Sequence, residues 1–168
     1  MTAVIRPGTI GLTPISGDVG TFIRVGQWLN GDGFENYQHA FLSTTGVPGG
    51  AIIEAEPGGA RVGNVSEYSN IYWCENIATK YSDKLIDVVI AANKYLGTPY
   101  SFLDYGALFA RRLHLPVPGL QHYIASTGHM ICSQLVARAY LDAGCPLYDR
   151  WTGYVTPLDL YNLDRSLA

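Results

Sequence analysis

Residues 128–144 read GHMICSQLVARAYLDAG, and this stretch decides the fold. Apolar side chains recur behind Cys132 at helical spacing, and Gly144 is typical of the residue that follows a helix. Cys132 lies on the same apolar stripe, in the first turn. Free backbone N–H groups and the helix dipole favour an anion there, so the pattern predicts a thiol with a lowered pKa. The alternative is a small buried apolar residue. The stripe consists of Leu135, Val136, Ala139, Tyr140 and Ala143.

Length and composition predict one domain over residues 1–168. Hydrophobic residues make up 48% and charged residues 15%, and the net charge is −3 without a cluster of Lys and Arg, which argues against nucleic-acid partners and a polybasic membrane anchor. No apolar run reaches about 18 residues, so no transmembrane segment is expected. No secretion signal is visible at the start. Three cysteines without CxxC spacing predict no disulfide framework and a cytoplasmic, reducing compartment.

Two hydrophobic periodicities follow one another along the chain. Alternating segments with short turns predict an antiparallel sheet, and later segments at helical spacing predict helices packed on it, which is an α+β fold. Ser82 or Asp83 is the expected cap of one helix, and residues after Pro146 are expected to form a looped tail. The expected strands are 9–12, 34–43, 51–56, 60–65 and 70–75. The expected helices are 16–29, 85–96, one from Ser101 or Asp104 to 113, and the Cys132 helix. The buried stripe expected for 85–96 is Leu85, Ile86, Val89, Ile90 and Asn93.

His39 is the candidate base for Cys132. It lies in the middle of the expected strand 34–43, and a papain-type site places its cysteine at a helix N-terminus and its histidine on a packed strand. Glu54 and Glu56 share one face of the next strand, where one carboxylate can accept the second ring N–H of the histidine. The alternatives are a histidine bonded to a backbone carbonyl and glutamates on a solvated face.

The other histidines predict no metal site. His114, His122 and His129 lie in or beside the loop before the Cys132 helix, and a zinc site built from them would have loose spacing and no clear further ligand. No cofactor is expected. Tyr100 follows the turn at 97–99 and either lines the cleft or packs as an ordinary tyrosine.

The order of these pieces resembles the circularly permuted NlpC-type papain-like family, which includes YiiX-like amidases and relatives of lecithin retinol acyltransferase. In that branch the histidine precedes the cysteine, which lies on a late helix. The resemblance spans residues 7 to 143, with Thr9 standing where the family has an aspartate and with an insertion at about 104–128 that is long enough for a lid or a partner surface. The matching pieces are PGTIGL (7–12), QHAF (38–41), IIEA (52–55), YLGTPY (95–100) and ICSQLV (131–136).

The resemblance implies a cysteine hydrolase, an amidase or peptidase, that acts through a thioester acyl-enzyme. Cys132 would be the nucleophile, His39 the base and Glu54 the residue that orients it, with Glu56 the less favoured third group. The backbone N–H groups of Cys132 and Ser133 would face the oxyanion. The expected partner is a peptide or acyl substrate such as a cell-wall peptidoglycan fragment.

Two other functions stay open from the sequence. One is a non-catalytic binding or structural module on the same fold, such as a component of a phage particle that contacts phage structural proteins and resides in the virion. The other is a lipid acyltransferase or thioesterase, which the lack of a basic amphipathic helix disfavours. A short distance between Cys132 and His39, with Glu54 on the far side of the ring, would favour the enzyme.

Overall fold

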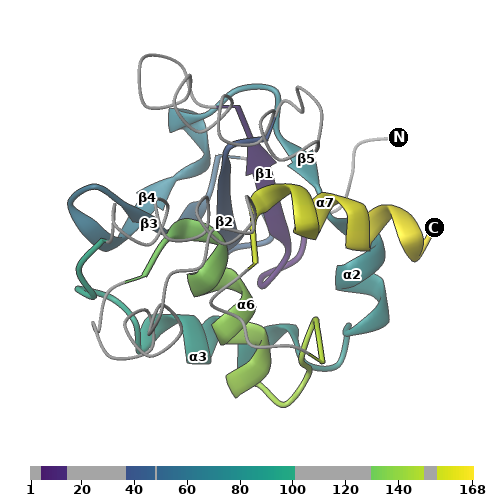
Figure 1. Ribbon diagram of the computed structural model, residues 1–168. Coiled ribbons are helices and arrows are strands. Elements are labelled where there is room, and N and C mark those ends of the chain that lie inside the picture. The colour runs from purple at the N-terminus through teal and green to yellow at the C-terminus, as the bar shows by residue number, and fades with distance from the viewer. Residues whose placement is uncertain (1–4, 15–36, 48, 101–129, 150–154) are drawn as a thin grey trace, which may run out of the picture.

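A computed structural model describes residues 5–14, 37–47, 49–100, 130–149 and 155–168 (Figure 1). The described part is an α+β fold, in which a five-stranded antiparallel sheet has the order β4-β3-β2-β1-β5. The strands are β1 (Ile10–Thr13), β2 (His39–Ser43), β3 (Ala51–Glu56), β4 (Gly59–Asn64) and β5 (Tyr72–Trp73). The helices are α2 (Glu75–Lys80), α3 (Leu85–Asn93), α6 (Cys132–Asp142) and α7 (Pro157–Ser166), with a 3₁₀ turn η1 (Val65–Glu67).

The two faces of the sheet differ in chemistry because side chains alternate along each strand. One face carries apolar side chains such as Leu42 and Ile53, which are fully buried beneath the helices. The opposite face carries His39, Phe41 and Glu54, and Phe41 lies opposite Glu54 in the ladder between β2 and β3. Strand alternation thus places the core residues Leu42 and Ile53 on one face of the sheet and the polar side chains of His39 and Glu54 on the other.

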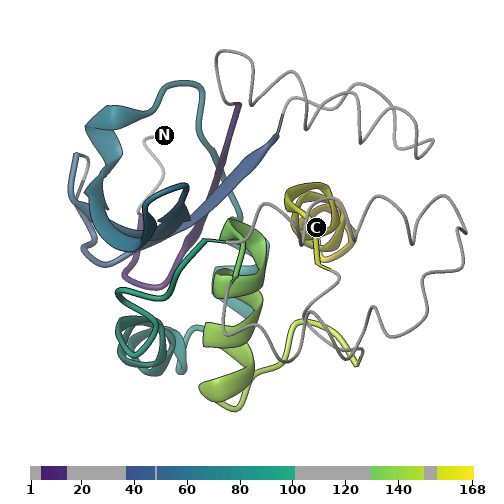
Figure 2. The same cartoon turned by 60° about the vertical axis from the view of Figure 1, so that its left-hand side comes forward.

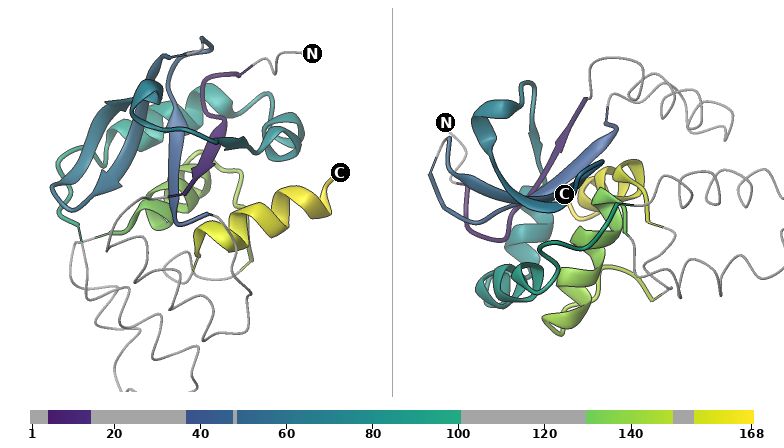
Figure 3. Two further views of the ribbon diagram at one scale, coloured as in Figure 1. Left: turned by 90° about the horizontal axis from the view of Figure 1, so that it is seen from above. Right: turned by 90° about the vertical axis from the view of Figure 1, so that its left-hand side faces the viewer.

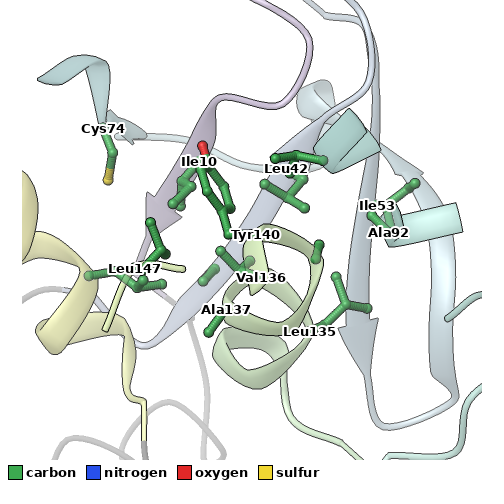
Figure 4. Close-up of a cluster of buried hydrophobic side chains, with 14 of the residues drawn as sticks. Ile10, Leu42, Ile53, Cys74, Ala92, Leu135, Val136, Ala137, Tyr140 and Leu147 are labelled. Carbon is green, nitrogen blue, oxygen red and sulfur yellow. The ribbon is translucent and has the colours of Figure 1, made fainter. Parts of the chain in front are cut away.

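Helix α6 packs its apolar stripe against the sheet and against α3, and Figure 2 shows α3 and α6 side by side. The stripe expected from the sequence is confirmed for its first four members, which are fully buried. Figure 4 shows the α6 side chains directed at strand residues Ile10, Leu42 and Ile53. The Tyr140 hydroxyl donates to the carbonyl of Gly8 at 2.9 Å, which satisfies its polar end inside the core. This packing fixes the orientation of α6, and with it the position of Cys132.

The stripe predicted for 85–96 is wrong in part. Leu85 is buried as expected, but Ile86 and Ile90 are 60% and 57% exposed. The buried face instead runs through Leu85, Val88 and the pair Ala91–Ala92. Helix α3 buries the face that packs against α6 and the sheet, and this face carries alanines, while Ile86 and Ile90 lie on the outer side. The predicted cap is also wrong, because the residue before the helix is Lys84 and it makes no side-chain capping bond.

Strand β2 begins later than predicted. His39 is its first residue rather than its middle, because it pairs with Thr13, the last residue of β1, and the ladder ends with its partner strand. Strand β3 has the predicted bounds, 51–56, and β1 and β4 are displaced by one residue from their predicted ranges. The strand predicted at 70–75 is reduced to β5.

Helices α2 and α7 were missed by the sequence reading, which expected a looped tail where α7 lies. Thr156 caps α7 by accepting from the backbone N–H of Asp159, with Pro157 at the first helical position. Asp164 on α7 accepts from the backbone N–H of Ile77 on α2 at 2.9 Å. Helix α7 packs against α2 and also contacts α6, beside which it lies in Figure 3. Helices α2 and α7 therefore stabilise each other.

Several predictions fall outside the described residues: the helix 16–29, the helix ending at 113, the insertion at 104–128 and the three loop histidines His114, His122 and His129. Within the residues described, no helix has both the length and the apolar character needed to cross a membrane.

Candidate active site

Cys132 is the first residue of α6 and its side chain is buried. The side chain of Gln134 accepts from the backbone N–H of Ile131 at 2.9 Å, so this donor is occupied at the helix entrance. Ser133 donates its hydroxyl to the carbonyl of Val155 at 2.8 Å, which ties the first turn to the segment before α7. The candidate nucleophile thus sits on a helix terminus whose neighbours on both sides are fixed by hydrogen bonds.

His39 lies between Cys132 and Glu54. Its Nε2 atom is 2.7 Å from Oε2 of Glu54, and since an ionised carboxylate only accepts, Nε2 carries the proton of this bond. The ring also shares a side-chain hydrogen bond with Cys132. Because Nε2 is engaged by Glu54, the nitrogen left for the thiol is Nδ1. The three side chains that the sequence singled out are therefore brought together from α6, β2 and β3.

The protonation of His39 reflects these neighbours. Burial lowers its pKa, but hydrogen bonds with Cys132 and Glu54, together with their negative charge, more than offset burial and raise the pKa to about 9. The ring is therefore protonated at neutral pH in this arrangement. An imidazolium between a thiol and a carboxylate favours the thiolate form of the cysteine.

Glu54 is fully buried, yet its carboxylate is surrounded by polar groups. The Tyr68 hydroxyl donates to Oε2 at 2.5 Å, and Nη2 of Arg61 lies 2.8 Å from Oε1. The Arg61 contact is an ion pair without the alignment of a hydrogen bond. A Cβ atom at Gly63 would collide with Oε1 of Glu54, so the glycine leaves the space that the carboxylate needs. Partners on both oxygens make it possible to bury this charge.

The remaining predicted residues lie at the edge of the site. Glu56 is partly exposed and pairs with Nε of Arg61 at 2.9 Å, while its Oε1 lies 2.8 Å from the Tyr68 hydroxyl oxygen. Tyr100 forms a parallel bridge with Met130, two residues before Cys132, which places its backbone beside the entrance of α6. Glu56 thus contacts the partners of Glu54 rather than serving as the primary partner of His39.

A metal ion is a possible occupant by ligand type, since one ligand atom each of His39, Glu54 and Glu56 lies within 4.8 Å of the others. In the structure, however, these atoms bond to one another, to Tyr68 and to Arg61. The guanidinium already supplies a positive charge to both carboxylates. The three side chains are therefore already engaged by protein groups through hydrogen bonds and ion pairs.

Sequence reasoning missed Arg61 and Tyr68. A signal for Arg61 existed, because a two-residue turn at 57–58 places it opposite Glu54 in the β3–β4 hairpin. Tyr68 had a weaker one: Asn64 and Glu67 have the spacing of a capping box, which marks a turn just before it. No local sequence pattern indicated that this turn would lie over the face of the sheet that carries His39 and Glu54.

Comparison with known proteins finds no matching protein family, no matching curated protein and no matching solved structure.

Proposed function

We propose that this chain is a cysteine hydrolase of the permuted papain-like type, acting on an amide bond as an amidase or peptidase. The observation that carries the proposal is that His39 contacts Cys132 and Glu54 at once, while all three are buried. The order histidine, glutamate, cysteine along the chain agrees with the permuted branch of the family. The fold supports it through a cysteine at a helix N-terminus next to an antiparallel sheet.

The chemistry proceeds in two stages. The Cys132 thiolate attacks the carbonyl carbon, a C–S bond forms, and the carbonyl electron pair moves to oxygen. Backbone N–H groups at the start of α6, those of Cys132 and Ser133, face this oxyanion, because that of Ile131 is occupied by Gln134. The His39 imidazolium gives its proton to the leaving amine as the C–N bond breaks, which yields a thioester.

Water then completes the cycle. Neutral His39 takes a proton from water, the resulting hydroxide equivalent attacks the thioester carbon, and the C–S bond breaks to return the Cys132 thiolate and a carboxylic acid. Glu54 keeps the Nε2–H of His39 directed away from the thiol, so that Nδ1 faces the reaction in both stages.

Alkylation rates at the three cysteines test the thiolate. Iodoacetamide at pH 6, with modified sites quantified by peptide mass spectrometry, is expected to label Cys132 at least about tenfold faster than Cys74 or Cys145. Burial raises the pKa of both reference thiols, and all three side chains are buried, which makes them internal controls. His39→Gln should remove most of this advantage. Equal rates at the three sites would contradict the proposal.

A second candidate is a binding or structural module, such as a phage particle component, and the 1% exposure of Cys132 favours it. A substrate screen distinguishes the two. Muropeptides and simple acyl esters are incubated with the wild-type chain and with Cys132→Ala, and release of product is followed by mass spectrometry. Amide cleavage lost in Cys132→Ala supports the hydrolase, and ester cleavage alone favours the thioesterase or acyltransferase alternative. No turnover together with slow labelling of Cys132 favours the module.

A further inference from the structure

We propose that Tyr68 and Arg61 are positioning residues that together set how closely the Glu54 carboxylate approaches His39: Tyr68 holds Oε2 beside the ring, and Arg61 draws Oε1 toward β4. This inference rests on the proposed function for its purpose, since the carboxylate matters because His39 serves Cys132. Its geometry is independent of that purpose. Tyr68 meets the polar end of His39 at Nε2, on the side of Glu54, and Arg61 contacts the carboxylates, so both would act through Glu54.

Tyr68 controls the oxygen that faces His39. Its hydroxyl lies 2.5 Å from Oε2 of Glu54, 2.8 Å from Oε1 of Glu56 and 3.3 Å from Nε2 of His39. A hydroxyl has one proton to donate, and the shorter contact assigns it to Glu54. Oε2 of Glu54 therefore accepts two bonds, one from His39 and one from Tyr68, which fix its direction.

The Tyr68 ring is held by stacking. It lies against Phe41 with ring centroids 5.3 Å apart and an interplanar angle of 18°, and against His39 at 5.2 Å. Phe41 is fully buried and contacts Trp73 edge-on. The ring position is thus set by apolar contacts, and the hydroxyl can be removed without removing the ring.

Arg61 holds the other oxygen. Its guanidinium lies 2.8 Å from Oε1 of Glu54 and 2.9 Å from Oε2 of Glu56, and Nη2 also donates to Glu67 at 2.6 Å. Three carboxylates thus share one guanidinium. If Tyr68 released Oε2, Arg61 would draw the Glu54 carboxylate toward β4 and away from His39.

The turn that carries Tyr68 is fixed at both ends. Asn64 accepts from the backbone N–H of Ser66 at 2.9 Å, and Glu67 accepts from that of Asn64 at 2.7 Å, which forms a reciprocal cap of η1. On the other side, Thr13 donates to the carbonyl of Ser69 at 2.9 Å. Glu67 therefore both caps the turn and binds Arg61, and Arg61 in turn contacts the buried carboxylate of Glu54.

The titration of His39 reports the position of Glu54. Among the described residues, the charged or titratable groups that face the ring are Cys132 on α6, Glu54 on β3 and Tyr68 after η1; Glu56 and Arg61 lie one contact further out. The hydrogen bond from Glu54 raises the His39 pKa against the opposing effect of burial. A displaced carboxylate must therefore lower it.

The experiment uses the full chain labelled with ¹⁵N-histidine, with His39 assigned by its loss in His39→Gln. In Tyr68→Phe, the NMR titration midpoint of His39 is expected to fall by about one pH unit. An unchanged midpoint would overturn the proposal. A raised midpoint would overturn it as well, because it would mean that the hydroxyl competes with His39 for Oε2 instead of positioning it.

Tyr72→Phe is the matched control. It removes a tyrosine hydroxyl that donates to a different buried carboxylate, Asp164, at 2.8 Å, and should leave the His39 midpoint unchanged. Glu67→Gln is the second variant, in case Tyr68→Phe does not fold. It keeps a capping side chain, frees Arg61 toward Glu54 and should shift the midpoint downward by a smaller amount. No shift in Glu67→Gln would count against the role of Arg61. Fast alkylation of Cys132 with an unmoved His39 midpoint would reject the positioning role alone, whereas slow alkylation in wild type would reject the proposed function alone.

Discussion

Two carboxylates are buried in the part of the chain that the structure describes, Glu54 and Asp164, and their surroundings differ. Asp164 accepts from groups that stay neutral: the backbone N–H of Ile77 at 2.9 Å, the Tyr72 hydroxyl at 2.8 Å and the Asn76 amide at 3.3 Å. Glu54 instead meets an imidazole, a phenol and a guanidinium. Both side chains are essentially inaccessible to solvent. The same chemical group therefore joins helices at one site and controls protonation at the other.

The difference lies in what the donors can do. Neutral, fixed donors to Asp164 tie α7 to α2 and β5, and no proton needs to move for that purpose. Donors to Glu54 include His39, a titratable ring that also bonds to Cys132. In the proposed mechanism, the proton on the other ring nitrogen, Nδ1, passes to the leaving amine. A buried carboxylate is thus evidence of catalysis only when one of its partners titrates and contacts a nucleophile.

The largest expected effect is a loss of chain stability when Asp164 is replaced. Asp164→Asn places an amide NH₂ group, or a weaker acceptor, against three donors, and should lower the free energy of unfolding by about 2–3 kcal/mol. Chemical denaturation at pH 7 measures it. The rate of Cys132 alkylation in the folded variant should not change. A loss of reactivity at Cys132 would show that the two carboxylates are coupled and would break the comparison.

The next largest effect is expected on the reactivity of Cys132 when Glu54 is replaced. Glu54→Gln keeps the shape of the side chain but removes the negative charge beside the His39 imidazolium, so Cys132 alkylation at pH 6 should slow by about tenfold, equivalent to about 1.4 kcal/mol. Site-resolved mass spectrometry measures the rate, with Cys145 as the reference thiol in the same chain. A rate equal to that of wild type would mean that Glu54, like Asp164, only stabilises the fold and does not affect the reactivity of Cys132.

The smallest effect is a pH dependence that sharpens the role of His39. Cys132→Ala removes one of the two groups that raise the His39 pKa against burial and keeps the other, Glu54. We expect Glu54 still to outweigh burial in this variant. A group whose pKa is higher in the folded than in the unfolded chain stabilises the fold fully below its unfolded pKa, near 6.5, and loses this stabilisation as pH rises through the folded value. Cys132→Ala should therefore be more stable at pH 6 than at pH 9, by about 1 kcal/mol, relative to Cys132→Ala/His39→Gln. Parallel stability curves for the two variants would contradict a raised His39 pKa in the folded chain.

The sequence predicted the three central residues of the candidate site but not the residues that surround them. Each of the three central residues had a local signal in the sequence. Cys132 stands at the start of a predicted helix, His39 lies in an alternating strand, and Glu54 lies on one face of the next strand. Glu56 shared the signal of Glu54, and register alone could not rank the two. Arg61 and Tyr68 became visible only once β4 and η1 were in place, because their contacts cross strands or arise in an irregular turn.

Elements with a strong hydrophobic periodicity could be predicted from the amino-acid sequence. Alternation along 51–56 and the apolar stripe behind Cys132 predicted β3 and α6, because one face of each must be buried wherever it packs. The buried face of α3 became known only from its packing against α6 and the sheet, which leaves Ile86 and Ile90 exposed. The packing also decided that Glu54, and not Glu56, bonds to His39, because the pairing of β2 with β3 ends at Phe41 and Glu54 and because Arg61 and Tyr68 hold the Glu54 carboxylate.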